Sequence, residues 1–144
     1  MLATHSIAVC YVTIVAFVSA APKGMLNDTV FKTCAETYKL PAMTFDSRHP
    51  MEPIPDNPGE DIMCFHECLL TGEGTLKNGV FQEDVTKERF TMVMTAKMGS
   101  VNQEALDKVL ACGKKTAEGK CATSYAIFKC IDDVLISVFK GSPH

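Results

Sequence analysis

Seven cysteines in a chain of 144 residues constrain this sequence more than any other feature. Cys10 lies within the first 20 residues, and the other six are spread over the rest of the chain. These six are Cys34, Cys64, Cys68, Cys112, Cys121 and Cys130. In an oxidising compartment, an even number of cysteines in a short chain indicates a disulfide framework, although the count alone leaves the pairing open.

The first 20 residues indicate that the compartment is oxidising. They contain none of the 14 Lys+Arg and 17 Asp+Glu residues, and an apolar run at 7–18 ends in Val18-Ser19-Ala20. A membrane span needs about 20 apolar residues, so this shorter run before small residues predicts a secretory signal peptide at 1–20. We therefore expect an exported chain of one domain at 21–144, without Cys10.

The charge balance argues against binding to nucleic acid. The net charge is -3, and the lysines and arginines form no cluster. Binding to nucleic acid through phosphates requires such a cluster. No later apolar run reaches the length of a membrane span. The sequence therefore predicts a soluble secreted protein that does not bind nucleic acid.

Helical patterns dominate 21–144, and no segment shows sustained strand-type alternation. Asn57 is expected to cap the second helix with Pro58 at its first position. The apolar segment at 131–139 either extends the last helix or folds back on the body. The expected helices are 28–40, 58–72, 82–97, a fourth that opens at 100–102 and ends at 112–113, and 119–130, with a proline-rich connection at 41–58 and a loop marked by 72–74 and 78–79. The predicted class is all-α, a compact bundle of five to six helices.

The spacing of the six cysteines is x29, x3, x43, x8 and x8. In a secreted helical chain of this length, that spacing resembles the insect odorant-binding protein family, the carriers of pheromones and general odorants. The resemblance covers 21–144 and implies an apolar cavity inside the bundle. It also implies three disulfides that pair Cys34 with Cys68, Cys64 with Cys121, and Cys112 with Cys130.

A surplus of apolar side chains is consistent with such a cavity. Met92, Met94 and Met98 fall within seven positions of one expected helix, where flexible thioethers would adapt to different ligands. Ordinary core packing is the competing interpretation. Tyr125 is the candidate for a polar contact with a ligand oxygen. The resemblance implies a wall formed by Phe90, Val93, Met94, Met98, Val101, Leu106, Leu110, Tyr125, Phe128, Val138 and Phe139.

No catalytic motif emerges from the sequence. His66-Glu67, between Cys64 and Cys68, faintly resembles the helical motif of secreted phospholipase A2, but the adjacent cysteine pair and the calcium loop of those enzymes are missing. The same residues could form part of a zinc site, but no second CxxC pair completes a tetrahedral shell. We therefore expect no enzymatic activity, metal or other cofactor, and a surface or half-buried position for His66.

The function that follows is a secreted carrier of small hydrophobic molecules, volatile or semi-volatile. The resemblance implies delivery through sensillum lymph or another body fluid to an olfactory receptor or membrane surface. Acid would favour release through Asp132, Asp133, His144 and the terminal carboxylate. We also expect that the protein can form a weak homodimer. Asn27 either begins a glycosylation sequon or caps the first helix.

Two alternatives stay open at this level. One is an extracellular interaction protein, such as a helical toxin or a protease inhibitor, in which the disulfides only stabilise a surface. The other keeps the same fold but carries non-olfactory ligands in haemolymph, saliva or reproductive fluid.

Overall fold

The computed structural model describes residues 28–40 and 54–140. These ranges contain five α-helices, a short 3-10 helix at Cys112–Lys114 and a two-stranded hairpin. The α-helices are α2 (Asp28–Thr37), α4 (Glu60–Gly72), α5 (Glu83–Met98), α6 (Gln103–Ala111) and α7 (Ala122–Lys140). The all-α class is therefore confirmed. The expected signal peptide, Asn27 and His144 lie outside the described residues.

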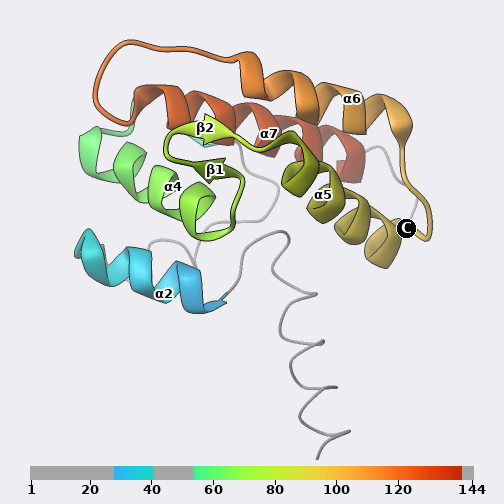
Figure 1. Ribbon diagram of the computed structural model, residues 1–144, viewed down its shortest axis with the longest axis horizontal. Helices are drawn as coiled ribbons and strands as arrows, with labels where there is room; N and C mark the ends of the chain where they lie inside the picture. The colour runs from blue at the N-terminus through green and yellow to red at the C-terminus, as the bar shows by residue number, and fades with distance from the viewer. Residues whose placement is uncertain (1–27, 41–53, 141–144) are drawn as a thin grey trace, which may run out of the picture.

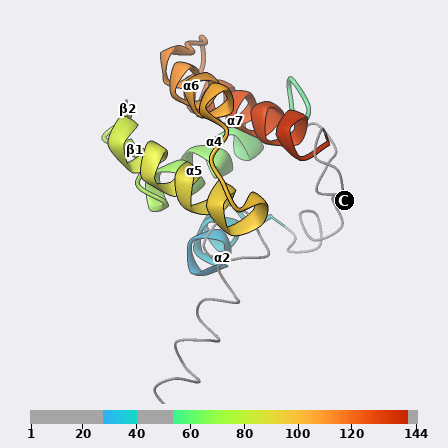
Figure 2. The ribbon, with the colours of Figure 1, turned by 90° about the vertical axis from the view of Figure 1, so that its right-hand side faces the viewer.

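The helices are arranged around α4 and α7. α4 packs against α7 on one side and α2 on another, while α6 packs against both α5 and α7. In two perpendicular views, α6 and α7 lie side by side at the edge of the molecule opposite α2 (Figures 1 and 2). The main helix neighbour of α2 is therefore α4, whereas α6 connects α5 to α7.

The start of α4 differs from the prediction. The helix begins at Glu60, and its N-cap is Gly59, whose φ of 99° lies in the region that only glycine adopts readily. Because this residue breaks the helical path, Asn57 does not cap α4 and Pro58 precedes the helix. At α6 the expected start is confirmed, since the Asn102 side chain accepts a hydrogen bond of 3.1 Å from the Ala105 backbone N–H.

A β-hairpin stands where a loop was expected. Its strands are β1 (Leu76–Lys77) and β2 (Val80–Phe81), joined by Asn78-Gly79. Both turn residues have positive φ, 53° and 76°, as the tight Asn-Gly hairpin turn requires. Strands of two residues are too short to show a period of two, so Asn-Gly was the usable signal in the sequence.

The apolar segment at 131–139 continues α7 to Lys140 without a break. Ile131 and Ile136 are buried, and the Phe139 ring lies 5.2 Å from Lys97 Nζ at the end of α5. The open question about this segment is thus settled as an extension of the last helix. None of the helices in the described ranges is both long and apolar enough to cross a membrane.

All three implied disulfides are present and confirm the pairing. Cys34–Cys68 joins α2 to α4, Cys64–Cys121 joins α4 to the residue before α7, and Cys112–Cys130 joins the 3-10 helix to α7. Cys64 and Cys68 lie one turn apart on α4 but bond to different elements. The two bonds consequently fix α4 to both of its neighbours.

The core consists of two clusters. The larger, here called the main cluster, has ten buried members, and the smaller, the α2–α4 cluster, has four. Phe128 packs against both of them. The main cluster comprises Leu70, Leu76, Phe90, Met94, Ala105, Leu106, Val109, Cys112, Ile127 and Ile131. The α2–α4 cluster comprises Cys34, Ala35, Phe65 and Leu69.

Candidate functional site

Most of the predicted lining residues meet in one place. Phe90, Met94 and Leu106 are members of the main cluster, and their exposed fractions are 0%, 0% and 3%. Five further candidates pack against that cluster while remaining partly exposed: Val101, Leu110, Phe128, Val138 and Phe139. Eight of the eleven candidates therefore share one apolar environment between α5, α6 and α7.

The remaining candidates on α5 differ in exposure. Val93 is buried, whereas Met98, at the end of the helix, is 37% exposed. Met92 is 60% exposed, so this one of the three closely spaced methionines faces outward. Thr86, which sequence reasoning missed, is fully buried, and its hydroxyl donates a hydrogen bond of 2.8 Å to the Gln82 carbonyl. That bond to the preceding turn satisfies the buried hydroxyl.

Tyr125 lies on α7 in a group of rings that we call the aromatic cluster, formed by Phe65, His66, Tyr125 and Phe128. The His66 ring centroid lies 5.2 Å from that of Tyr125 and 4.3 Å from that of Phe128. The Tyr125 hydroxyl donates a hydrogen bond to the Pro55 carbonyl. The polar atom expected to meet a ligand thus has a partner in the chain.

The expected surface or half-buried position of His66 is wrong, because its side chain is only 4% exposed. Its Nδ1 lies 2.7 Å from the Ile62 carbonyl oxygen, one turn earlier on α4. This partner lets a polar ring sit among the aromatic side chains without an unsatisfied nitrogen at that position. The helical spacing of 62 and 66 was visible in the sequence, but the direction in which α4 faces α7 was not.

Segment 54–59 leads into α4 and lies against α7. Ile54 is buried, and Lys129 Nζ on α7 lies 3.6 Å from Asp56 Oδ1. Lys129 also bonds Asp133 at 3.0 Å on its own helix, and that hydrogen bond raises the pKa of Lys129. Asp133 thus pairs within α7, and the link to another element runs through Asp56.

A second charged contact joins α4 to α5. The Arg89 guanidinium pairs with the Glu73 carboxylate and donates a hydrogen bond of 3.2 Å to the Glu73 carbonyl. Burial lowers the pKa of Arg89. The Glu73 side chain is almost fully enclosed, with 3% exposed. The pair fixes the end of α4 beside the hairpin and supports the fold there.

The structure also contains a groove that sequence reasoning missed. It has a volume of about 460 Å³ and runs between α2 and α4, lined by residues of 29–38 and 67–72. The predicted lining residues lie elsewhere, between α5, α6 and α7. The sequence held no signal for this groove because its existence depends on the spacing of two packed helices.

In the ranges 28–40 and 54–140, no three His, Cys, Asp or Glu side chains are grouped so that they could hold a metal ion. Cys64 and Cys68, the core of the zinc interpretation, are instead bonded to Cys121 and Cys34. A disulfide sulfur is not a thiolate, so neither is available as a ligand in this state.

Comparisons with known proteins place the chain in a family. A profile described as the PBP/GOBP family matches residues 24–133. General odorant-binding protein 56a of Drosophila melanogaster is 32% identical over 88 residues, which are 61% of this chain and 55% of that protein. The chain thus spans about half the length of this curated relative.

A solved structure has the same fold. It is the fatty acid binding protein OBP56a from the oral disk of the blowfly Phormia regina, with a TM-score of 0.52 and 24% identity over 74% of this chain and 86% of that chain. The profile match extends over more than half of the sequence and includes all six paired cysteines. The chain therefore belongs to the PBP/GOBP family of insect odorant-binding proteins.

Proposed function

We propose that this protein is a carrier that binds small hydrophobic molecules in the main cluster and transports them without changing them. The observation that carries the proposal is the gathering of Phe90, Met94 and Leu106 with five further candidates between three helices. The family is one of binding proteins, and two similar proteins are named for odorant and fatty acid binding. A medium- or long-chain amphiphile is therefore the proposed ligand class.

Ligand entry requires the main cluster to rearrange. Phe90 and Met94 have no exposed surface, so a ligand must displace side chains that now touch one another. Met94 suits this role, since an unbranched thioether changes rotamer at low cost and fits differently shaped partners. Tyr125 would hold a ligand oxygen if its hydroxyl exchanged the Pro55 carbonyl for that oxygen.

Secretion, delivery to a receptor or membrane surface, and release in acid are further parts of the proposal. Lys129 bonds Asp133 and lies near Asp56 on the segment that covers the start of α7. These contacts hold segment 54–59, which carries the Pro55 carbonyl, against α7. In this proposal, acid weakens that attachment and the affinity for the ligand falls.

Titration of the secreted protein with Nile red tests the proposal. We expect saturable binding of one dye per chain, displacement by palmitic acid or a long-chain alcohol, and weaker binding at pH 5 than at pH 7.4. Dye uptake that never saturates would reject an internal site and favour an interaction protein. Equal affinity at the two pH values would reject acid release while leaving the carrier function standing.

A further inference from the structure

The groove between α2 and α4 has the dimensions and chemistry of a second binding site. Its volume of about 460 Å³ falls within the range of roughly 300–1,000 Å³ that small-molecule sites occupy. The stretch from Thr29 to Tyr38, the residue after α2, borders it and is about 14 Å long at 1.5 Å per residue. Its wall is mostly apolar and includes Val30 and the Cys34–Cys68 disulfide.

The two helices that form the groove are held apart at fixed points. Cys34–Cys68 links their middles. Val30 packs so closely on Gly72 that a Cβ at Gly72 would lie 2.4 Å from the Val30 Cγ1. Because these contacts fix the distance and the orientation of α2 relative to α4, the groove is largely preformed. Opening it for a ligand would therefore cost little free energy.

Among the described residues that line this apolar groove, one carries a charge. Glu67 of α4 accepts a hydrogen bond of 2.6 Å from the Ser124 hydroxyl through Oε2. Within the described residues, no lysine or arginine nitrogen lies within 4.0 Å of its carboxylate. An ionised carboxylate has room for about four hydrogen bonds, so Glu67 retains accepting capacity.

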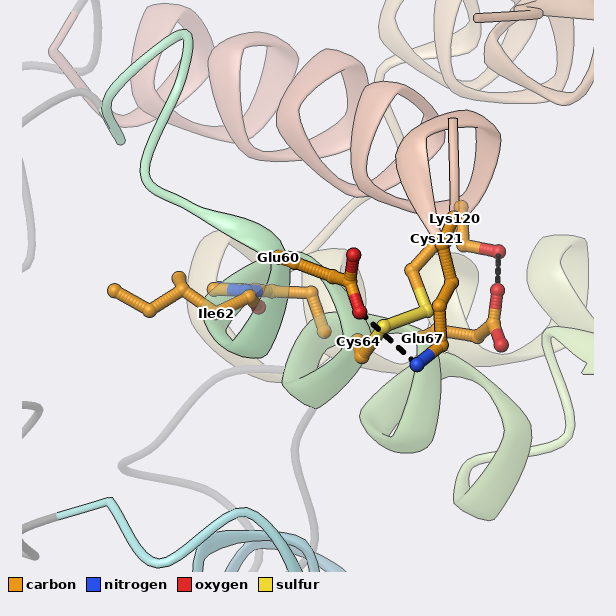
Figure 3. Close-up of a disulfide and its surroundings, with 8 residues drawn as sticks. Glu60, Ile62, Cys64, Glu67, Lys120 and Cys121 are labelled. Atoms are coloured by element: carbon orange, nitrogen blue, oxygen red, sulfur yellow. Dashed lines mark hydrogen bonds and ion pairs between the residues drawn. A yellow bond between two sulfur atoms is a disulfide. The ribbon is translucent and has the colours of Figure 1, made fainter. Parts of the chain in front are cut away.

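Lys120, which lies beside this region, is already paired. Figure 3 shows Glu67 beside the Cys64–Cys121 disulfide, with Lys120 bonded to Glu60 at 3.0 Å. Lys120 is therefore paired with Glu60, while Glu67 lines the groove and is held through Oε2 by Ser124 of α7. A ligand cation with a hydrocarbon body complements both the Glu67 carboxylate and the apolar wall, whereas a fatty acid would be repelled.

From this geometry we propose that the groove binds a small amphiphilic amine, with its ammonium group on Glu67 and its hydrocarbon part along Val30 and the Cys34–Cys68 disulfide. The ammonium would donate to Glu67 Oε1 and to solvent, while Ser124 keeps its bond to Oε2. This site does not depend on the carrier function proposed for the main cluster, and it prefers the opposite ligand charge.

The test is an NMR titration of isotope-labelled, full-length secreted protein with octylamine, in the presence and absence of saturating Nile red. We expect octylamine to shift the backbone signals of Thr33, Cys34, Cys68 and Thr71 under both conditions. Octanol, which has the same chain without the charge, should bind at least tenfold more weakly. Shifts confined to α5, α6 and α7, or equal affinities for the two compounds, would overturn the proposal.

Two variants sharpen this titration. Glu67→Gln keeps an oxygen for Ser124 but loses the charge, so octylamine affinity should fall at least tenfold while octanol affinity is unchanged. Thr33→Trp should fill the groove from an exposed position and abolish binding of octylamine. Thr37→Trp, exposed on the same helix but outside the groove, is the matched control. Unchanged octylamine affinity in both Glu67→Gln and Thr33→Trp contradicts the site, whereas failure of Nile red to bind concerns only the carrier function.

Discussion

The α2–α4 pair and the three-helix region of α5, α6 and α7 are stabilised in different ways. The α2–α4 cluster has only four buried members, one of which is a disulfide cysteine, Cys34. The main cluster has ten, drawn from several elements. Two of the three disulfides attach to α4, and the third, Cys112–Cys130, spans a separation of only 18 residues. Covalent bonds therefore supplement burial where the apolar core is small.

This difference suits the two proposed binding sites. A groove between two covalently tied helices keeps its shape when empty, whereas a site inside a packed cluster must open before it can accept a ligand. Buried side chains can move apart without loss of the fold only if other contacts maintain the helix positions. The Cys112–Cys130 bond and the Glu73–Arg89 pair supply such contacts at the edges of the three-helix region.

The largest expected effect comes from placing a charge in the main cluster. Met94→Glu should abolish Nile red binding and cost several kcal/mol of unfolding free energy, because a carboxylate at a fully buried position loses its hydration. Met92→Glu introduces the same group on the same helix at a position 60% exposed, and it should change neither quantity appreciably. Urea unfolding and dye titration measure both. Similar losses in the two variants would show that α5 is not oriented as described.

Removing one disulfide at a time should affect the two regions differently. Replacing Cys34 and Cys68 by serine frees a loop with a separation of 34 residues and should cost about 4 kcal/mol, against about 3 kcal/mol for Cys112 and Cys130. In the first variant we expect the amides of α2 to lose their protection from hydrogen exchange while α5 and α6 keep theirs. In the second, protection should fall in all three helices of the main cluster together. Retained protection of α2 without its disulfide would disprove the comparison.

Two glycines allow a steric test in each region. A Cβ at Gly72 would lie 2.4 Å from the Val30 Cγ1, and one at Gly113 would lie 2.2 Å from the Phe81 ring. Neither glycine has a positive φ, so the cost of alanine is overpacking, about 1–3 kcal/mol. Gly72→Ala should push α2 away from the end of α4, and Gly113→Ala should displace the hairpin.

A compensating change distinguishes overpacking from other effects. Val30→Ala removes the methyl groups that a Cβ at Gly72 would strike, so Gly72→Ala should be better tolerated in the presence of Val30→Ala than alone. Thermal unfolding of the two single variants and the double variant forms the required cycle. Purely additive losses would mean that the Gly72 contact does not fix the approach of α2.

The sequence predicted features that depend on local pattern or on fixed spacing. Helix α6 was expected to open at 100–102, and the disulfide pairing followed from the resemblance in cysteine spacing. Features that depend on how elements face one another were not accessible. The burial of His66 depends on the direction in which α4 meets α7. The close approach of the Phe81 ring to Gly113 depends on a hairpin whose strands have only two residues each.

The candidate lining was implied by the family resemblance, which assigns the wall to certain helices but does not give the depth of each residue. Phe90 and Met94 are fully buried, whereas Met98, four residues further along the same stripe, lies at the helix end and is 37% exposed. Ile127 and Ile131, members of the main cluster, were missed because the inner face of α7 was assigned through Tyr125 and Phe128. The groove residue Glu67 carried no signal, since an exposed helical glutamate looks the same in sequence.

The smallest effect is expected for the ion pair that joins the two regions beside a disulfide. Glu60 and Lys120 are 57% and 71% exposed and lie next to Cys64–Cys121, which already ties the same two segments (Figure 3). Solvent and salt screen such a pair, so Lys120→Gln should lower the melting temperature less than Gly72→Ala does. In 1 M salt, the wild-type protein and Lys120→Gln should have the same melting temperature.

The pH dependence of this pair gives a second check on the sign of the effect. The hydrogen bond from Lys120 to Glu60 raises the pKa of Lys120 above its usual 10.5. A raised lysine pKa contributes stability that is fully present below the unfolded-state value and is lost only as the pH rises through the higher folded-state value. The melting-temperature difference between the wild-type protein and Lys120→Gln should therefore stay constant between pH 7 and 9. A difference that declines across this range would contradict the raised pKa of Lys120. A difference that exceeds the effect of Gly72→Ala would assign to the ion pair a share of the stability that we attribute to Cys64–Cys121.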